Sequence, residues 1–143
     1  MSQIPASADW FSFRRVDVTR QDARILVVDD DSNSAAAITQ YLSSEDSHCR
    51  VGYGGLQAVA IGTDWKPHLI LMDVSMPYFN GVEAALSLRN NPETEQIVMI
   101  AFTALDKAEV KRHMKDHEFD AYCRKGSAPD EIVNFLDWFL VKS

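Results

Sequence analysis

Six polar side chains in this sequence lie at or just beyond the ends of short apolar runs, and their types suit phosphoryl chemistry. They are Asp29, Asp30, Asp31, Asp73, Thr103 and Lys125. A carboxylate can attack phosphorus and form an aspartyl phosphate, further carboxylates can hold a divalent cation, and a hydroxyl and an ammonium can bind the phosphoryl oxygens. The set can do this only if the fold brings its members together.

Asp73 is the candidate nucleophile. It follows the apolar run 69–72, which is typical of a strand buried on both faces of a parallel sheet. Pro77 and the pair Asn80-Gly81 do not extend that strand. Because ligand sites in open α/β sheets lie beyond the carboxyl ends of the strands, an acidic residue at this point is a functional candidate. Taken alone, Asp73 is equally compatible with a helix cap.

A second acidic group, Asp29 to Asp31, follows the apolar run 25–28. Three adjacent carboxylates repel one another unless a cation or a helix N-terminus offsets their charge. Mg²⁺ prefers a few carboxylate oxygens together with water and phosphate oxygens, which suits this group. Asp31 or Ser32 also fits the cap of a helix over 34–42. Capping accounts for one of the three acids, so we favour an Mg²⁺ site over capping alone.

Five strand candidates alternate with five helix candidates. The strands are expected at 25–28, 49–53, 69–72, 97–102 and 121–123, and the helices at 34–42, 56–63, 82–89, 107–117 and 129–140. Their spacing of roughly 20 to 28 residues is the rhythm of right-handed βαβ units, which predicts a doubly wound α/β fold with a parallel sheet. Such a sheet gathers the six polar side chains at one edge. Inward positions are expected at Leu56, Val59 and Ala60 in the second helix and at Ile132, Phe135, Leu136 and Phe139 in the last.

The composition limits what these side chains can belong to. A chain of 143 residues with 46% hydrophobic and 24% charged residues suits one globular domain. The formal net charge of -7 argues against nonspecific binding to nucleic acid or anionic membranes. No apolar run approaches the ~20 residues of a membrane span, so a cytoplasmic protein is expected. Cys49 and Cys123 form no metal-ligand or redox motif, and we expect two reduced thiols.

Residues 1–23 form an extension before the first predicted strand, and residues 24–143 form the domain. The segment 9–18 contains three aromatic residues that a plain linker does not need, so it is expected to dock on the domain or on a partner. These are Trp10, Phe11 and Phe13. Three arginines of the extension are interspersed with aspartates and are expected on a solvated face. They are Arg14, Arg15 and Arg20.

Four motifs resemble the receiver domain of two-component response regulators. They are ILVVDDD, LILMDVSMPYFNG, IAFTA and YCRKGSAPDE, within residues 24–141. The resemblance implies a flavodoxin-like fold with a five-stranded parallel sheet in the order 2-1-3-4-5. It also implies a sensor histidine kinase or a histidine phosphotransfer protein as phosphoryl donor. The response is then passed on by altered protein contacts rather than by turnover of another substrate.

By the same resemblance, Asp73 is the phosphoacceptor, Thr103 hydrogen-bonds the phosphoryl group and Lys125 pairs with it. Movement of Thr103 would leave space for the ring of Tyr122 on the fifth strand. This would alter the face formed by the fourth helix, fifth strand and fifth helix, where a downstream target or a second copy is expected to bind. The alternative is that Tyr122 is a static core aromatic.

The resemblance also implies a metal site. Asp30 would be a direct Mg²⁺ ligand with Asp73 beside it, and Asp29 would act largely through water. The main-chain carbonyl of Ser75 would complete the shell. Asp31 matches no catalytic position of the family and is expected to cap a helix.

Three local features need separate expectations. Gly126 follows Lys125 where the family usually has proline, so a trans peptide is expected there. Glu118-Phe119-Asp120 precedes the last strand and is expected to form a partner-specific surface. Residues 138–140 make the last helix more apolar than one buried face needs, which predicts an exposed contact patch unless the N-terminal aromatics cover it.

Two other functions remain open. Asp29-x-Asp31 imitates the nucleophile motif of haloacid dehalogenase-type phosphatases, but that reading leaves Asp73 without a role and provides no strand for the last metal acids. A receiver-shaped binding module that is never phosphorylated is the second alternative, and Gly126 keeps it open. No output domain is expected after the last helix, so we expect a stand-alone receiver, or one cut from a longer protein, with no DNA binding of its own.

Overall fold

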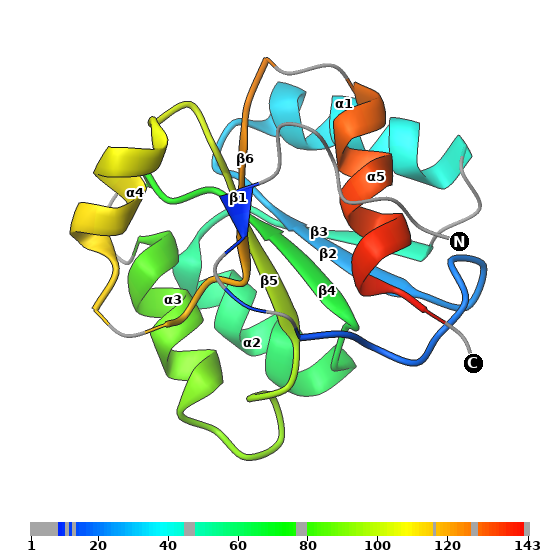
Figure 1. The fold of residues 1–143 in the computed structure, drawn as a ribbon, viewed down its shortest axis with the longest axis horizontal. Coiled ribbons are helices and arrows are strands. Elements are labelled where there is room, and N and C mark those ends of the chain that lie inside the picture. The colour runs from blue at the N-terminus through cyan, green and yellow to red at the C-terminus, as the bar shows by residue number, and fades with distance from the viewer. Residues whose placement is uncertain are drawn as a thin grey trace.

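One sheet forms the centre of the structure, a computed structural model that describes residues 9–10, 12, 14–44, 48–76, 80–115, 117–126 and 129–141. Its strands are β1 (Asp9–Trp10), β2 (Arg24–Val28), β3 (His48–Gly52), β4 (Leu69–Met72), β5 (Val98–Thr103) and β6 (Ala121–Arg124). The strand order is β1-β6-β5-β4-β2-β3 (Figure 1). All five strands expected from the apolar runs are present, with small shifts at their ends.

The strands β2 to β6 are mutually parallel. If they are numbered 1 to 5 along the chain, their order across the sheet is 2-1-3-4-5. The doubly wound α/β fold is therefore confirmed. β1 is an addition that the apolar runs did not predict. It pairs antiparallel with β6, with Asp9 opposite Tyr122 and Trp10 opposite Ala121.

Helices cover both faces of the sheet. They are α1 (Ser32–Ser44), α2 (Gly55–Trp65), α3 (Gly81–Arg89), α4 (Lys107–His113) and α5 (Pro129–Phe139). α1 and α5 lie on one face, and α2, α3 and α4 lie on the other (Figure 1). Successive side chains of a strand point to opposite faces, so neighbours enter separate cores. Ile25 belongs to the core beneath α1 and α5, whereas Leu26 belongs to the core beneath the other three helices.

The expected inward face of α2 is wrong. Leu56 is 72% exposed and Ala60 is also exposed, while Val59 is only partly buried. The buried residues of this helix are Gly55, Ala58 and Gly62. A Cβ on Gly62 would lie 3.0 Å from Leu88 Cδ2 of α3, so the two helices approach closely at Gly62, while Val59, Ile61 and Trp65 pack against the core from positions beside it.

The inward stripe of α5 is confirmed, since Ile132, Phe135, Leu136 and Phe139 are all buried. The exposed patch expected at 138–140 is wrong. Leu140 is buried as well, and the backbone of Val16 bridges to it. The guanidinium of Arg15 lies 4.3 Å from the centroid of the Trp138 ring. The cover comes from Arg15 and Val16, while Phe11, Phe13 and the side chain of Trp10 lie outside the described residues.

The arginines of the extension contact the domain. The expected solvated face is wrong for Arg14 and Arg20, which are half-buried in ion pairs, whereas Arg15 is exposed as expected. Arg14 Nε lies 3.1 Å from Asp120 Oδ1, and Arg20 Nη1 lies 2.8 Å from Asp137 Oδ1. Arg15 Nε donates a hydrogen bond of 2.7 Å to the Trp138 carbonyl. These contacts join the N-terminal segment to the start of β6 and the end of α5.

The expected surface at Glu118-Phe119-Asp120 is wrong, because all three residues are buried. Phe119 is part of the core beneath α2, α3 and α4. The Asp120 carboxylate accepts hydrogen bonds from Arg89 Nη2 at 2.6 Å and from the Met99 amide at 2.8 Å. A buried carboxylate needs such partners, and here they come from the neighbouring helix and strand.

α4 is shorter than expected and ends at His113 rather than near residue 117. Met114 has an extended conformation, and its amide closes the helix on the Val110 carbonyl. The Lys115 amide donates to Glu118 Oε2 at 2.9 Å, which turns the chain toward β6.

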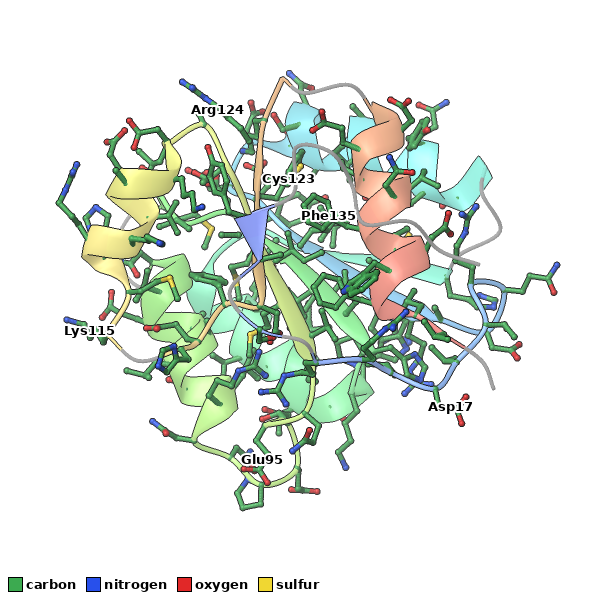
Figure 2. All side chains as sticks on the ribbon, in the orientation of Figure 1. Asp17, Glu95, Lys115, Cys123, Arg124 and Phe135 are labelled. Carbon is green, nitrogen blue, oxygen red and sulfur yellow. The ribbon has the colours of Figure 1, made fainter. Side chains whose placement is uncertain are left out.

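Both cysteines are free thiols, as expected. Cys49 lies on β3, and Cys123, which is labelled in Figure 2, lies on β6. Three strands lie between them, a separation too large for a disulfide. Burial raises the pKa of Cys49 to about 11 and that of Cys123 to about 12. Among the described residues, no helix is long and apolar enough to cross a membrane.

Gly81 should not tolerate a side chain. A Cβ there would lie 2.1 Å from the Asp73 carbonyl oxygen and 3.0 Å from Met72 Cγ. We expect Gly81→Ala to lower the free energy of unfolding by about 1–3 kcal/mol, because α3 must move away from the turn after β4. Urea denaturation followed by circular dichroism measures this. Gly54→Ala is the control, since nothing lies within 4 Å of a Cβ at that position. Equal stability of Gly81→Ala and wild type would contradict the packing argument.

Asp120→Asn should destabilise the fold strongly, because it leaves the Arg89 guanidinium buried without its counter-charge. Removing one partner of a buried ion pair costs about 3–5 kcal/mol, and we expect an effect near the lower limit because the amide keeps some hydrogen bonds. The same substitution at Asp137, whose ion pair with Arg20 is partly exposed, should cost no more than about 1 kcal/mol. Denaturation curves that rank the two variants in the opposite order would refute this role of Asp120.

Candidate functional site

The predicted site residues lie at the carboxyl ends of the parallel strands. Val28 of β2 is in register with Met72 of β4, and Met72 with Ala101 of β5, so these strands end close to one another. Asp29 and Asp30 follow β2, Asp73 follows β4, Thr103 ends β5 and Lys125 follows β6. The structure thus brings together side chains that are far apart in the sequence.

Lys125 connects two of the acids. Its Nζ lies 2.5 Å from Asp29 Oδ2 and 3.1 Å from Asp73 Oδ2. Asp29 is 2% exposed and Asp73 is 5% exposed, so both carboxylates have lost most of their water. Lys125 was expected near Asp73 as a partner of the phosphoryl group, whereas its contact with Asp29 was not expected, since no local pattern connects β6 to the end of β2.

Asp29, Asp30 and Asp73 form an acidic cluster in which one carboxylate oxygen of each lies within 4.8 Å of the others. Asp30 is exposed, while its two partners are buried. Carboxylate oxygens are hard ligands of the kind that Mg²⁺ prefers, and an exposed member leaves room for water. The donor set therefore fits a magnesium ion.

Asp31 does not belong to this cluster. Its Oδ1 accepts a hydrogen bond from the Asn33 amide at 3.0 Å, as an N-cap of α1 does. Its own amide donates to Asp29 Oδ1 at 2.9 Å, which orients that carboxylate. The helix cap expected at Asp31 agrees with these contacts.

Opposing effects act on the charges of Asp73 and Lys125. Burial raises the pKa of Asp73 and the charge of Asp29 adds to this, whereas Lys125 and a hydrogen bond with Thr103 act in the lowering direction. Burial alone would lower the pKa of Lys125, but its hydrogen bonds and charge interactions with Asp29 and Asp73 raise it above the usual value. Lys125 is therefore an ammonium at neutral pH and favours the ionised form of Asp73.

The loop after β4 is held close to Asp73. The amide of Ser75, an exposed residue, lies 3.3 Å from Asp73 Oδ1 and donates to it. Asn80 caps α3 through a reciprocal pair of hydrogen bonds with Glu83, and the Gly81 amide donates to the Val74 carbonyl. Residues 77–79 lie outside the described part of the chain.

Thr103 is fully buried, and its Oγ1 accepts a hydrogen bond of 3.3 Å from the Leu105 amide. The Tyr122 hydroxyl donates to the Leu105 carbonyl at 2.7 Å, so Leu105 connects the two predicted switch residues. Sequence reasoning missed Leu105, because it contributes only backbone atoms. After Lys125, Gly126 has a φ of 90°, a conformation that favours glycine. No cis peptide occurs among the described residues, in agreement with the expected trans bond.

Comparison with known proteins agrees with this geometry. The sequence matches the response regulator receiver domain family over residues 25–137. Protein PilH of Pseudomonas aeruginosa is 34% identical over 85 residues, which covers 59% of this chain and 70% of PilH. The response regulator protein VraR of Staphylococcus epidermidis is 33% identical over 113 residues, which covers 78% of this chain but only 53% of VraR. The chain thus spans about half the length of that relative.

Among solved structures, the chemotaxis protein CheY4 of Vibrio cholerae is similar with a TM-score of 0.77. The superposition covers 83% of this chain and 99% of that chain at 21% sequence identity, a level that speaks for the fold alone. The family match, in contrast, runs from β2 into α5 and includes the whole acidic cluster. The chain therefore belongs to the response regulator receiver domain family.

Proposed function

We propose that Asp73 accepts a phosphoryl group from a histidine kinase or a histidine phosphotransfer protein. The observation that carries this proposal is the position of the Lys125 ammonium between Asp73 and Asp29 at the acidic cluster. An acceptor carboxylate must be ionised although it is buried, and a nearby ammonium favours that form.

The transfer consists of one displacement at phosphorus. A carboxylate oxygen of Asp73 attacks and forms the new O–P bond, the P–N bond of the donor phosphohistidine breaks, and its electron pair goes to the imidazole nitrogen. Lys125 and the Thr103 hydroxyl bind phosphoryl oxygens, where negative charge is concentrated. Hydrolysis of the acyl phosphate later returns Asp73 to its free form.

Mg²⁺ is the proposed cofactor, with Asp29, Asp30, Asp73 and the main-chain carbonyl of Ser75 as the residues that would hold it. When bound, the ion neutralises charge on the phosphoryl oxygens and on the clustered carboxylates. The carboxylates orient the ion, and the Ser75 amide contact keeps the loop after β4 near Asp73.

The output of the domain is proposed to be a change of protein contacts, not turnover of a further substrate. Thr103, Leu105 and Tyr122 are joined by hydrogen bonds, so movement of Thr103 toward a phosphoryl group would reach Tyr122. Tyr122 lies on β6, between α4 and α5, and the face formed by these three elements is the proposed binding surface for a target or a second copy. The cytoplasmic location expected from the composition stays a prediction.

The two alternatives are less well supported. A dehalogenase-type phosphatase would need Asp29 as nucleophile and would give no role to Asp73, which lies in the same acidic cluster and contacts Lys125. A receiver-like module that is never phosphorylated is hard to reconcile with the pairing of Lys125 and Asp73.

Incubation with acetyl phosphate and Mg²⁺ should add the mass of one phosphoryl group to the wild-type chain and none to Asp73→Asn. Intact-mass spectrometry measures this. Asp31→Asn is the matched control, because Asp31 caps α1 and should label like wild type. An equal adduct on wild type and on Asp73→Asn would exclude Asp73 as the acceptor.

In Lys125→Gln, the loss of phosphorylation by acetyl phosphate on acidification should begin at a higher pH than in wild type. Loss of the ammonium removes the main influence that lowers the pKa of Asp73, so a larger fraction of Asp73 is protonated and unreactive below neutral pH. We expect the midpoint of the labelling rate against pH to rise by about one unit or more. Arg124→Gln removes an exposed charge at the preceding position and should leave the midpoint unchanged (Figure 2). The same midpoint in all three proteins would refute the electrostatic role of Lys125.

A further inference from the structure

The N-terminal segment 9–18, here called the strap, occupies the edge of the sheet. The structure describes it at residues 9–10, 12 and 14–18. β1 pairs with Tyr122 and Ala121 of β6, and the Ser12 amide donates to the Asp120 carbonyl at 3.2 Å. Without the strap, β6 would be an edge strand with unpaired backbone groups, which other chains can bind.

The Asp120 carboxylate holds the strap with one of its two oxygens. Oδ2 accepts from Arg89 and from the Met99 amide, which belong to the domain itself. Oδ1 accepts from Ser12 Oγ at 2.5 Å and from Arg14 Nε at 3.1 Å. Release of Ser12 and Arg14 therefore leaves Arg89 and the Met99 amide paired with Asp120. The domain offers an acceptor site for an extended segment that carries a hydroxyl and a guanidinium two residues apart.

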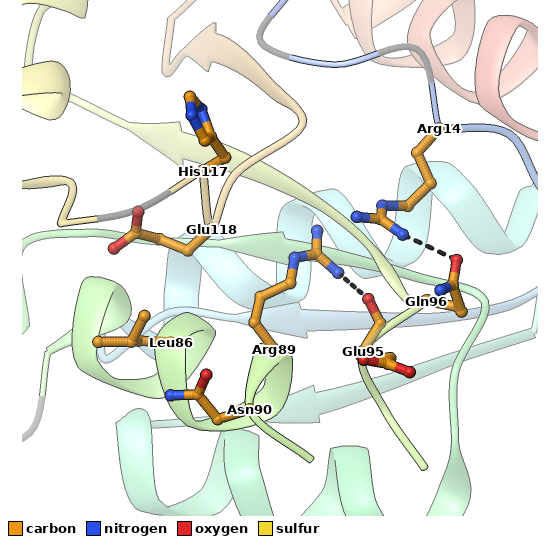
Figure 3. Close-up of a pocket in the computed structure, with 8 residues that line it drawn as sticks. All are labelled: Arg14, Leu86, Arg89, Asn90, Glu95, Gln96, His117 and Glu118. Atoms are coloured by element: carbon orange, nitrogen blue, oxygen red, sulfur yellow. Dashed lines mark hydrogen bonds between the residues drawn. The ribbon is translucent and has the colours of Figure 1, made fainter. Parts of the chain in front are cut away.

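Arg14 also closes one side of a pocket beside this site. Figure 3 shows Arg14 bonded to Gln96 on one side of the pocket and Arg89 bonded to Glu95 on another. His117 and Glu118, which precede β6, also line it. The strap is thus joined to the loop before β5 as well as to β6.

A second anchor lies at the end of α5. The Val16 amide donates to the Phe139 carbonyl at 2.8 Å, and the Val141 amide donates to the Val16 carbonyl at 2.8 Å. The guanidinium of Arg15 lies over the ring of Trp138 and donates a hydrogen bond to the Trp138 carbonyl. The strap therefore runs from β6 to α5 and covers part of both.

β6 connects the strap to the phosphoacceptor. Asp120 and Ala121, at its start, hold the strap, whereas Lys125, just past its end, contacts Asp73. Tyr122 takes part in both systems, since its backbone pairs with β1 and its hydroxyl bonds the Leu105 carbonyl next to Thr103. The ladder between β1 and β6 is only two residues long. A ladder of two residue pairs contributes little stability of its own, so the docking of the strap depends on its contacts with Asp120 and α5 as well.

We propose that the strap is a regulatory cover of the β6 edge, docked while Asp73 is unmodified and weakened in its docking when Asp73 carries a phosphoryl group. The inference rests on the proposed function of Asp73. A phosphoryl group gives Lys125 and Thr103 new oxygen partners, so Leu105 and the hydroxyl of Tyr122 must rearrange. The backbone of Tyr122 carries this change to the short ladder with β1. Because coupling between two sites is reciprocal, a docked strap must also make the phosphorylated state of Asp73 less favourable.

Hydrogen exchange with mass spectrometry on the full chain tests the proposal, with beryllofluoride and Mg²⁺ as the mimic of the acyl phosphate. Exchange in peptides from residues 9–18 should become about fivefold faster or more when the mimic is added. Peptides from α2 should not change, and Asp73→Asn should show no effect anywhere. If the loop 103–106 changes and the strap does not, the inference is overturned while the function of Asp73 stands. If nothing changes in wild type, the function of Asp73 itself is refuted, and the inference with it.

The reverse effect needs a variant that loosens the strap and leaves the site untouched. Ser12→Ala combined with Arg14→Gln removes both strap contacts to Asp120 but keeps those of Arg89 and Met99. It should bind beryllofluoride more tightly, by at most the factor by which the mimic loosens the strap, because contacts of β1, Arg15 and Val16 remain. Lys66→Gln is the control, since it removes one charge from an exposed ion pair with Glu93. Unchanged affinity in a variant whose strap exchanges rapidly would overturn the inference.

Discussion

The Lys125 ammonium between two buried carboxylates is the interaction on which the carboxyl edge of the sheet depends. Asp29 and Asp73 lie in surroundings that disfavour their charged forms, and each also repels the other. One cation within hydrogen-bonding distance of both offsets these costs. These contacts can be replaced. A metal ion could bind the carboxylates of Asp29 and Asp73, and a phosphoryl group could bind the ammonium of Lys125.

A parallel sheet covered on both faces explains why the polar residues emerge at this edge. Each central strand sends alternate side chains into two apolar cores, so no charged group fits along its length. Charged groups fit only where the strands end. Because the strands are parallel and in register, four of these ends lie side by side, and the chemistry of four distant segments becomes one site.

The N-terminal segment and Asp120 show how an edge of the sheet is covered. Asp120 is buried and charged, and it is tolerated because Arg89, the Met99 amide and two residues of the strap give its oxygens partners. The domain supplies half of these partners and the extension supplies the rest. The strap is therefore held by specific polar contacts in addition to backbone pairing, which makes its position sensitive to the position of β6.

Local patterns along the chain predict the strands, the approximate positions of their ends and the residues that follow them. Apolar runs such as 69–72 indicate buried strands, and Asp73 and Lys125 were found because they follow such runs. Local patterns failed where a distant segment decides. In α2 the buried positions are Gly55, Ala58 and Gly62 rather than Leu56, and Gly62 lies against Leu88 of α3. Asp120 is buried because Arg89 and the strap surround it. β1 and the contact between Lys125 and Asp29 arose only in the tertiary structure, since both join segments about a hundred residues apart, and periodicity carries information only over the length of one element.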